Sequence, residues 1–177
     1  MHVFWSKGYE GTSVDDLIAA MSISKSSLYQ SFGNKQDLFL ETIKLYLELT
    51  DRKRKAVLAN ASSVKQGMSM FFQGVVQFLL DSDHPCGCFY TNTATALGTL
   101  DQKIHTVIIR SSEKMEEDFY QFFLQGQLRG EIVPEKDIHA LAKFFVGLVR
   151  GISVIARIQK DPEALESIVT MGLKTLE

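Results

Sequence analysis

The hydrophobic residues near the start of the chain recur at helical spacing, and a short polar segment interrupts them. Apolar side chains in residues 14–21 follow at intervals of three or four, and Ser13 precedes them as a candidate N-cap. Residues 22–24 are too short for anything but a turn. Leu28 and Phe32 then form the apolar side of a second helix over residues 24–32. The pattern predicts a helix-turn-helix.

The rest of the chain has the same helical periodicity. Its three prolines, Pro85, Pro134 and Pro162, each stand at an apparent boundary, as expected if helices fill the intervals between them. The spacing predicts further helices over residues 35–55 or slightly beyond, 63–80, 87–98, 101–128, 135–158 and 162–176. We therefore expect an all-α protein.

The second helix of the pair carries an outward side suited to DNA. Lys25, Ser26, Ser27, Tyr29, Gln30 and Ser31 are left to face out when Leu28 and Phe32 face in. Residues 22–36 contain two lysines and no acid, so the segment can approach phosphates without repulsion of like charges. Lys35 stands at the start of the next helix, where the helix dipole disfavours a cation, and phosphate contact would explain it.

Residues 4–39, FWSKGYEGTSVDDLIAAMSISKSSLYQSFGNKQDLF, resemble the DNA-binding head of the TetR family of bacterial transcriptional regulators. The resemblance is direct over residues 1–48, and beyond them it rests on length and helical character. It implies a three-helix head over residues 1–46 and a helical effector-binding and dimerisation body over 47–177. The matching elements are Phe4, Gly8-Tyr9, Thr12-Ser13, Leu17-Ile18, Ile23-Ser24, Leu28-Tyr29, Phe32, Asn34-Lys35 and Leu38.

The resemblance also implies roles for individual residues. The positions of Ser13, Tyr29 and Lys35 usually contact phosphate, and the first outward positions of the recognition helix read bases. Lys25 suits a guanine edge, and serines are permissive readers. The expected DNA-binding set is Thr12, Ser13, Ser24, Lys25, Ser26, Ser27, Tyr29, Ser31 and Lys35.

The start of the chain departs from the family pattern. Members usually begin with a basic arm and a longer first helix, and Met1 falls in the middle of that helix. Residues 1–7 are too short to be helical alone, and we expect Val3, Phe4 and Trp5 to lean on Leu17, Leu28 and Phe32. We therefore expect residues upstream of Met1 in the natural protein.

The last two predicted helices have the character of an interface. The first of them is apolar nearly all round, which requires cover on two sides. Phe144, Gly147, Gly151, Val154 and Ile158 form its second apolar side. A homodimeric four-helix interface, which the resemblance implies, explains both sides. The residues expected there are Ile138, Leu141, Phe145, Leu148, Ile152, Ile155, Leu165, Ile168 and Leu173.

The middle helices are rich in aromatic residues, which suits a pocket for an apolar or aromatic small molecule, although most such residues are ordinary core. The candidate lining is Phe71, Phe72, Phe78, Phe89, Tyr90, Phe119 and Phe123. The small molecule would be the effector that releases the regulator from a palindromic operator in double-stranded DNA.

His84, Cys86 and Cys88 form the one segment with candidate metal or redox chemistry. The spacing is not that of structural zinc sites, and the run GCFYTN resembles a helix start in one TetR subgroup where the cysteine is a small buried residue. We expect no metal and no cofactor. The alternative is a thiol- or metal-responsive regulator that senses through Cys86 and Cys88.

Composition narrows the class of protein further. A net charge of −2 excludes a generally basic surface, so contact with DNA must be local, and the two cysteines favour a reducing cytoplasm. No uninterrupted apolar run approaches the length of a membrane span, so we expect no membrane. The alternative class is a helical enzyme or ligand carrier with a non-functional head. The sequence has no pattern of paired carboxylates, catalytic triad or phosphate-binding loop that would favour it.

Overall fold

The computed structural model describes residues 1–96 and 101–177, and every regular element among them is helical. The predicted all-α fold is confirmed. The elements are α1 (His2–Lys7), α2 (Val14–Met21), α3 (Lys25–Phe32), α4 (Lys35–Ala59), α5 (Val64–Leu80), α6 (Phe89–Ala94), α7 (Gln102–Leu128), α8 (Ile138–Ile158), α9 (Pro162–Leu173) and the 3₁₀ helix η2 (Lys174–Leu176).

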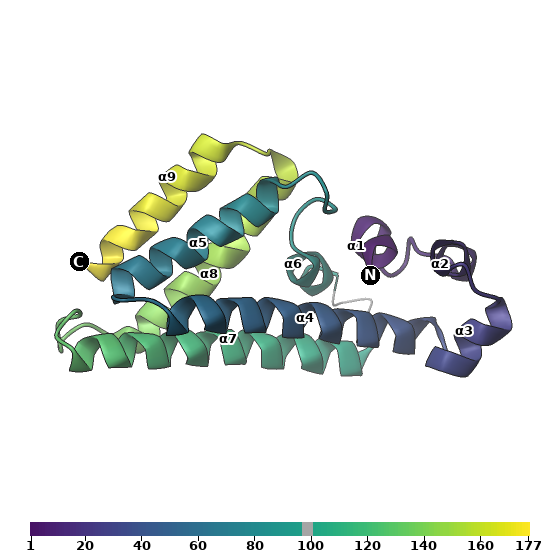
Figure 1. Cartoon of the computed structure of the whole chain (residues 1–177), viewed down its shortest axis with the longest axis horizontal. Helices are drawn as coiled ribbons and strands as arrows, with labels where there is room; N and C mark the ends of the chain where they lie inside the picture. Colours follow the sequence, from purple (N-terminus) through teal and green to yellow (C-terminus); the bar gives the residue numbers. More distant parts are fainter. Residues whose placement is uncertain (97–100) are drawn as a thin grey trace.

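The helices α1 to α3 form a head at one end of the molecule, next to the first turns of α4 (Figure 1). Side chains of Ser13, Ser24 and Asn34 accept backbone N–H groups at the starts of α2, α3 and α4. Each such cap satisfies a donor that the helix leaves unpaired. These bonds explain why two helices of only eight residues are well defined.

The first helix links the head to the body. Phe4 lies in the head, with its ring centroid 5.0 Å from that of Phe39. Trp5 instead reaches the body, where its ring lies 5.3 Å from Tyr46 and 5.7 Å from Phe78. Trp5 was expected to lean on Leu17, Leu28 and Phe32, but its ring packs on rings at the start of the body, because α1 lies against that end of the body.

Helix α4 is the element shared by the head and the body. It leaves α3 and runs alongside α7 (Figure 1), past the expected head–body boundary at residue 46 and on to Ala59. The buried side chains of Arg54 and Leu58 hold its last turns in the body, which explains an end beyond the charge cluster.

In the body, α8 packs against α5, α7 and α9, and α4 packs against α5 and α7. Helix α8 begins three residues later than expected, because Asp137 rather than Pro134 supplies the cap. Helix α6 is shorter than predicted, and residues 97–98 of that prediction lie outside the described part of the chain. By length and composition α8 could cross a bilayer, but it is the central helix of the body and 44% of its most apolar window is buried.

Candidate nucleic-acid interface and body cavity

Local hydrogen bonds fix the start of α2, and a left-handed residue makes the turn that leads into α3. Ser13 Oγ accepts the Asp16 N–H at 3.0 Å, and an Asp16 carboxylate oxygen accepts the Ser13 N–H at 2.9 Å. Lys7 donates to the other carboxylate oxygen at 2.6 Å. The bonds from Lys7 and from Ser13 lower the pKa of Asp16 to about 2. Ser22 takes a left-handed conformation with φ of 54°, which turns the chain into α3.

The first turn of α3 presents small polar groups and one cation. Lys25, Ser26 and Ser27 are all exposed, whereas Leu28 is 0% exposed and anchors the helix from beneath. Ser24 Oγ accepts the Ser27 N–H at 3.1 Å. This turn can therefore enter a groove without exposing apolar surface, which is the geometry of a recognition helix.

The remaining expected DNA contacts fall into two groups. Tyr29 is 41% exposed and Ser31 is exposed, and Lys35 extends over the Tyr9 ring with its ammonium 4.3 Å from the ring centroid. Thr12 is different, since it is 1% exposed and its hydroxyl donates to the Gly8 carbonyl at 2.6 Å. Thr12 therefore stabilises the turn before α2, and its buried side chain is not available to contact DNA.

A cavity of about 530 Å³ lies in the body between α4, α5, α7 and α8. Apolar and aromatic side chains form most of its wall, together with the cations of Lys53, Arg54 and Arg150. The lining residues are Tyr46, Leu47, Thr50, Lys53, Arg54, Ala56, Val57, Met70, Phe71, Gly74, Val75, Phe78, Leu79, Cys88, Tyr90, Ser111, Met115, Val149, Arg150 and Ser153.

The aromatic residues proposed from sequence divide between the cavity and the core. Phe71, Phe78 and Tyr90 line the cavity. The others pack within the core and do not line it, because they lie against other aromatic rings at centroid distances of about 6 Å. These residues are Phe72, Phe89, Phe119 and Phe123, each 0–1% exposed.

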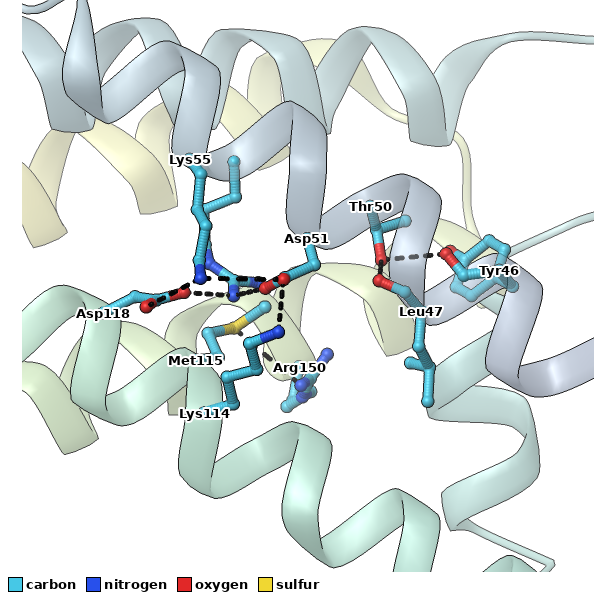
Figure 2. Close-up of polar contacts among 10 residues, drawn as sticks. Tyr46, Leu47, Thr50, Asp51, Lys55, Lys114, Met115, Asp118 and Arg150 are labelled. Atoms are coloured by element: carbon cyan, nitrogen blue, oxygen red, sulfur yellow. Dashed lines mark hydrogen bonds and ion pairs between the residues drawn. The ribbon is translucent and has the colours of Figure 1, made fainter.

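An ion-pair network borders the cavity (Figure 2). Arg54 is 5% exposed and donates to Asp51 of its own helix and, at 2.6 Å, to Asp118 of α7. Lys114 pairs with Asp51 at 2.6 Å, and Lys55 lies 3.7 Å from Asp118. The two carboxylates are thus fully engaged by three cations, which ties α4 to α7.

Arg150 is a half-buried arginine of α8, and its surroundings differ from those of the buried Arg54. Its guanidinium carbon lies 3.5 Å from the centroid of the Tyr90 ring, and one of its terminal nitrogens lies 3.8 Å from the Met115 sulfur. Burial lowers the pKa of Arg150. Sequence reasoning missed this residue, although a cation within the apolar pattern of residues 138–158 is a visible signal.

The proposed dimer residues mostly face the inside of the protomer. Five of them are buried in the core of the single chain and cannot contact a partner: Ile138, Leu141, Phe145, Ile152 and Leu165. The other four are half-buried: Leu148, Ile155, Ile168 and Leu173. The prediction is wrong for the five buried residues, because neighbouring helices of the same chain cover them; for the four half-buried residues it stays a prediction.

The exposed apolar residues of α8 and α9 form one surface, the α8–α9 face. Phe144 is 43%, Val154 41%, Ile158 81% and Met171 62% exposed. A Cβ added at Gly147 or Gly151 would meet open space. The two helices join closely, since a Cβ at Gly172 would lie 2.5 Å from Leu148 and 3.7 Å from Phe144. These apolar side chains are uncovered in the protomer.

The three side chains of the segment with candidate metal or redox chemistry lie in different surroundings. His84 stacks on Trp5 at a centroid distance of 5.7 Å, Cys86 is exposed, and Cys88 is buried with its sulfur 3.2 Å from the Tyr46 hydroxyl. Across residues 1–96 and 101–177, no three His, Cys, Asp or Glu side chains gather to hold a metal ion.

Both the head and the body of the chain match known protein families. Residues 1–42 match the family described as "Bacterial regulatory proteins, tetR family". Residues 66–171 match that described as "Tetracyclin repressor-like, C-terminal domain".

Two curated relatives cover nearly the whole chain. An uncharacterised HTH-type transcriptional regulator of Bacillus subtilis, YezE, is 33% identical over 100% of this chain and 92% of its own length. The HTH-type transcriptional repressor ComR of Escherichia coli is 32% identical over 99% of this chain and 83% of its own. The named relatives are regulators rather than enzymes.

Solved structures share the fold. A cysteine mutant of the TetR family regulator CifR, complexed with 26-bp operator DNA, has a TM-score of 0.88 at 28% identity and covers 98% of this chain and 90% of its own. A TetR regulator from Chloroflexus aurantiacus has a TM-score of 0.88 at 26% identity, with 99% and 88% covered.

Proposed function

The chain belongs to the TetR family of transcriptional regulators, and we propose that it is a homodimeric repressor that leaves a palindromic operator when a small molecule occupies the body cavity. It is a DNA-binding protein, and the exposed first turn of α3 is the observation that carries this function. Residues 1–46 are the DNA-binding head and 47–177 the effector-binding and dimerisation body. The protein acts in the cytoplasm.

The dimer uses the α8–α9 face rather than the stripe expected from sequence. Contiguous exposed apolar surface on a soluble chain marks an interaction site. Gly147 and Gly151 permit close approach of a second α8, and Phe144, Val154 and Met171 supply the apolar contact. A two-fold axis here places the two α3 helices on half-sites about 34–36 Å apart.

Helix α4 couples the cavity to DNA. Its first turns pack on the head through Leu38 and Phe39, and its second half lines the cavity between Tyr46 and Val57. A ligand that favours a shifted α4 therefore moves the head relative to its two-fold partner. The shift requires higher affinity of the ligand for the state that does not fit both half-sites.

Selection of binding sites from a random duplex library at fixed moderate salt tests this function. We expect an inverted repeat to be enriched. Failure to enrich any sequence would contradict operator recognition. The recovered repeat then serves as the operator in the experiments below.

Lys25→Ala is expected to weaken operator binding by about 1–3 kcal/mol and to change the preferred sequence, because Lys25 extends from the exposed first turn of α3 toward bases. Lys35→Ala should weaken all sequences alike and reduce the salt dependence, because Lys35 contacts phosphate. Fluorescence anisotropy with matched and mismatched duplexes at several salt concentrations measures both effects. If the two variants behave identically, this division of roles is wrong.

The second candidate is a regulator that senses oxidants through a thiol. It is favoured by one observation, the Cys88 sulfur on the cavity wall, 3.2 Å from the Tyr46 hydroxyl. On this alternative, Cys88→Ser abolishes oxidant-induced release from the operator, whereas Cys86→Ser, at an exposed position outside the cavity wall, gives a separate test of the second thiol. An unchanged oxidant response in the double variant would end the thiol hypothesis.

A further inference from the structure

The charges on the cavity wall are all of one sign. Lys53, Arg54 and Arg150 are among its lining residues, and no Asp or Glu is. The carboxylates of Asp51 and Asp118, which are not lining residues, pair with Arg54, Lys55 and Lys114 (Figure 2). A ligand in this cavity therefore meets an excess of positive charge in mostly apolar surroundings.

Most other polar groups of the wall are already used. The Thr50 hydroxyl donates to the carbonyls of Tyr46 and Leu47, and the Ser153 hydroxyl to the carbonyl of Val149. The Tyr90 hydroxyl donates to the Ile108 carbonyl at 3.3 Å. Because these hydroxyls already donate to the helices around the cavity, they have no free O–H to offer an acceptor group of a ligand.

Arg150 differs from Arg54, whose guanidinium donates to Asp51 and Asp118. The Nε atoms of both arginines are fully buried without a hydrogen-bond partner, but the dashed line from the Arg150 guanidinium in Figure 2 leads to the Met115 sulfur, a weak acceptor. Burial lowers the pKa of Arg150, yet arginine stays protonated in proteins. A half-buried cation without a counter-ion still loses part of its hydration, so a carboxylate that pairs with it is favoured.

We propose that the effector of this regulator is an organic acid, whose carboxylate pairs with the Arg150 guanidinium while its apolar or aromatic body fills the space between Phe71, Phe78 and Met70. This deepens the proposed function, because it names the chemical class of the ligand for the same cavity. The guanidinium fork matches a carboxylate with two parallel hydrogen bonds, and Lys53 adds attraction at longer range.

The position of Arg150 would also let ligand binding change the packing of the surrounding helices. It lies on α8, the helix that carries the exposed face, and it stacks on Tyr90 of α6. A carboxylate that draws the guanidinium away from Tyr90 changes contacts among α4, α6 and α8 together. The charged end of the ligand thus acts on the helices that connect the head to the dimer face.

Calorimetric titration of the full chain with three ligands of one shape tests the proposal: 4-phenylbutyrate, 4-phenylbutanol and 4-phenylbutylamine. We expect the acid to bind about 10-fold or more tightly than the alcohol, and the amine not measurably. In Arg150→Gln this preference for the acid should disappear, a loss of about 10- to 100-fold in affinity, whereas Arg150→Lys should retain part of it.

Two variants serve as controls. Arg52→Gln removes an exposed cation of α4 that does not line the cavity, so it should leave the preference for the acid unchanged. Gly74→Leu adds a side chain to the cavity wall where a Cβ meets nothing within 4 Å, so it should weaken acid and alcohol alike. Circular dichroism confirms folding of each variant.

The outcomes separate this proposal from the proposed function. Equal affinity for acid and alcohol, an unchanged preference in Arg150→Gln, or no binding of either ligand would overturn the assignment of an acid. If the alcohol nevertheless releases the protein from the operator, the proposed function is retained and only the assignment of an acid is lost. If the acid binds through Arg150 and operator affinity does not change, the acid site stands and ligand control of DNA binding fails.

Discussion

Replacing Gly151 by arginine is expected to convert the proposed dimer into monomers and to reduce operator affinity by about 100-fold or more. Gly151 lies in the middle of α8 on the exposed α8–α9 face, and an added Cβ meets nothing within 4 Å in the protomer. An arginine there fits the single chain but occupies the space of a partner helix and brings a charge into an apolar interface. A monomer then binds one half-site without the gain from its linked neighbour.

Sedimentation velocity and operator anisotropy at the same protein concentration measure the two effects. Gly151→Ala is the matched control, because both substitutions improve helix propensity and alanine is small enough to keep close approach. Val154→Glu, at a residue 41% exposed on the same face, gives an independent second variant. A Gly151→Arg protein that still sediments as a dimer and binds the operator normally would show that this face is not the interface.

The sequence predicted the helix-turn-helix closely because its signals are local. The Ser13 and Ser24 side chains cap helices within three residues of themselves, so the boundaries of α2 and α3 follow from short-range hydrogen bonds. The start of α8 was predicted too early, directly after Pro134. A proline marks only a boundary, whereas the cap at Asp137 sets where the helix starts.

The interface and the cavity depend on tertiary placement. Periodicity shows that α8 has two apolar sides, but only the packing of α5 and α7 decides which one faces inward. Aromatic content likewise predicts that rings will be buried, not whether a ring such as Phe119 faces a cavity or another ring. Arg54 and Arg150 line one cavity although they lie nearly a hundred residues apart in the sequence, so no local pattern joins them.

Phe145→Ala is expected to destabilise the protomer by about 3–5 kcal/mol, since it removes a large side chain from a tightly packed core. Phe145 is 0% exposed, and its ring lies 5.7 Å from Phe72 and 5.6 Å from Phe123. Had Phe145 been an interface residue, as its place in the hydrophobic stripe suggested, its loss would weaken association and leave the isolated protomer nearly as stable.

The adjacent residue separates these two cases. Phe144 is 43% exposed on the α8–α9 face, so Phe144→Ala should cost the protomer far less and weaken dimerisation instead. Because the stability of a dimer depends on protein concentration, both substitutions belong in the Gly151→Arg background, where urea unfolding reports the protomer alone. Equal losses of unfolding free energy at 144 and 145 in that background would contradict the assignment of opposite faces. A large loss at 145 alone would place the core and the partner surface on opposite sides of one helix.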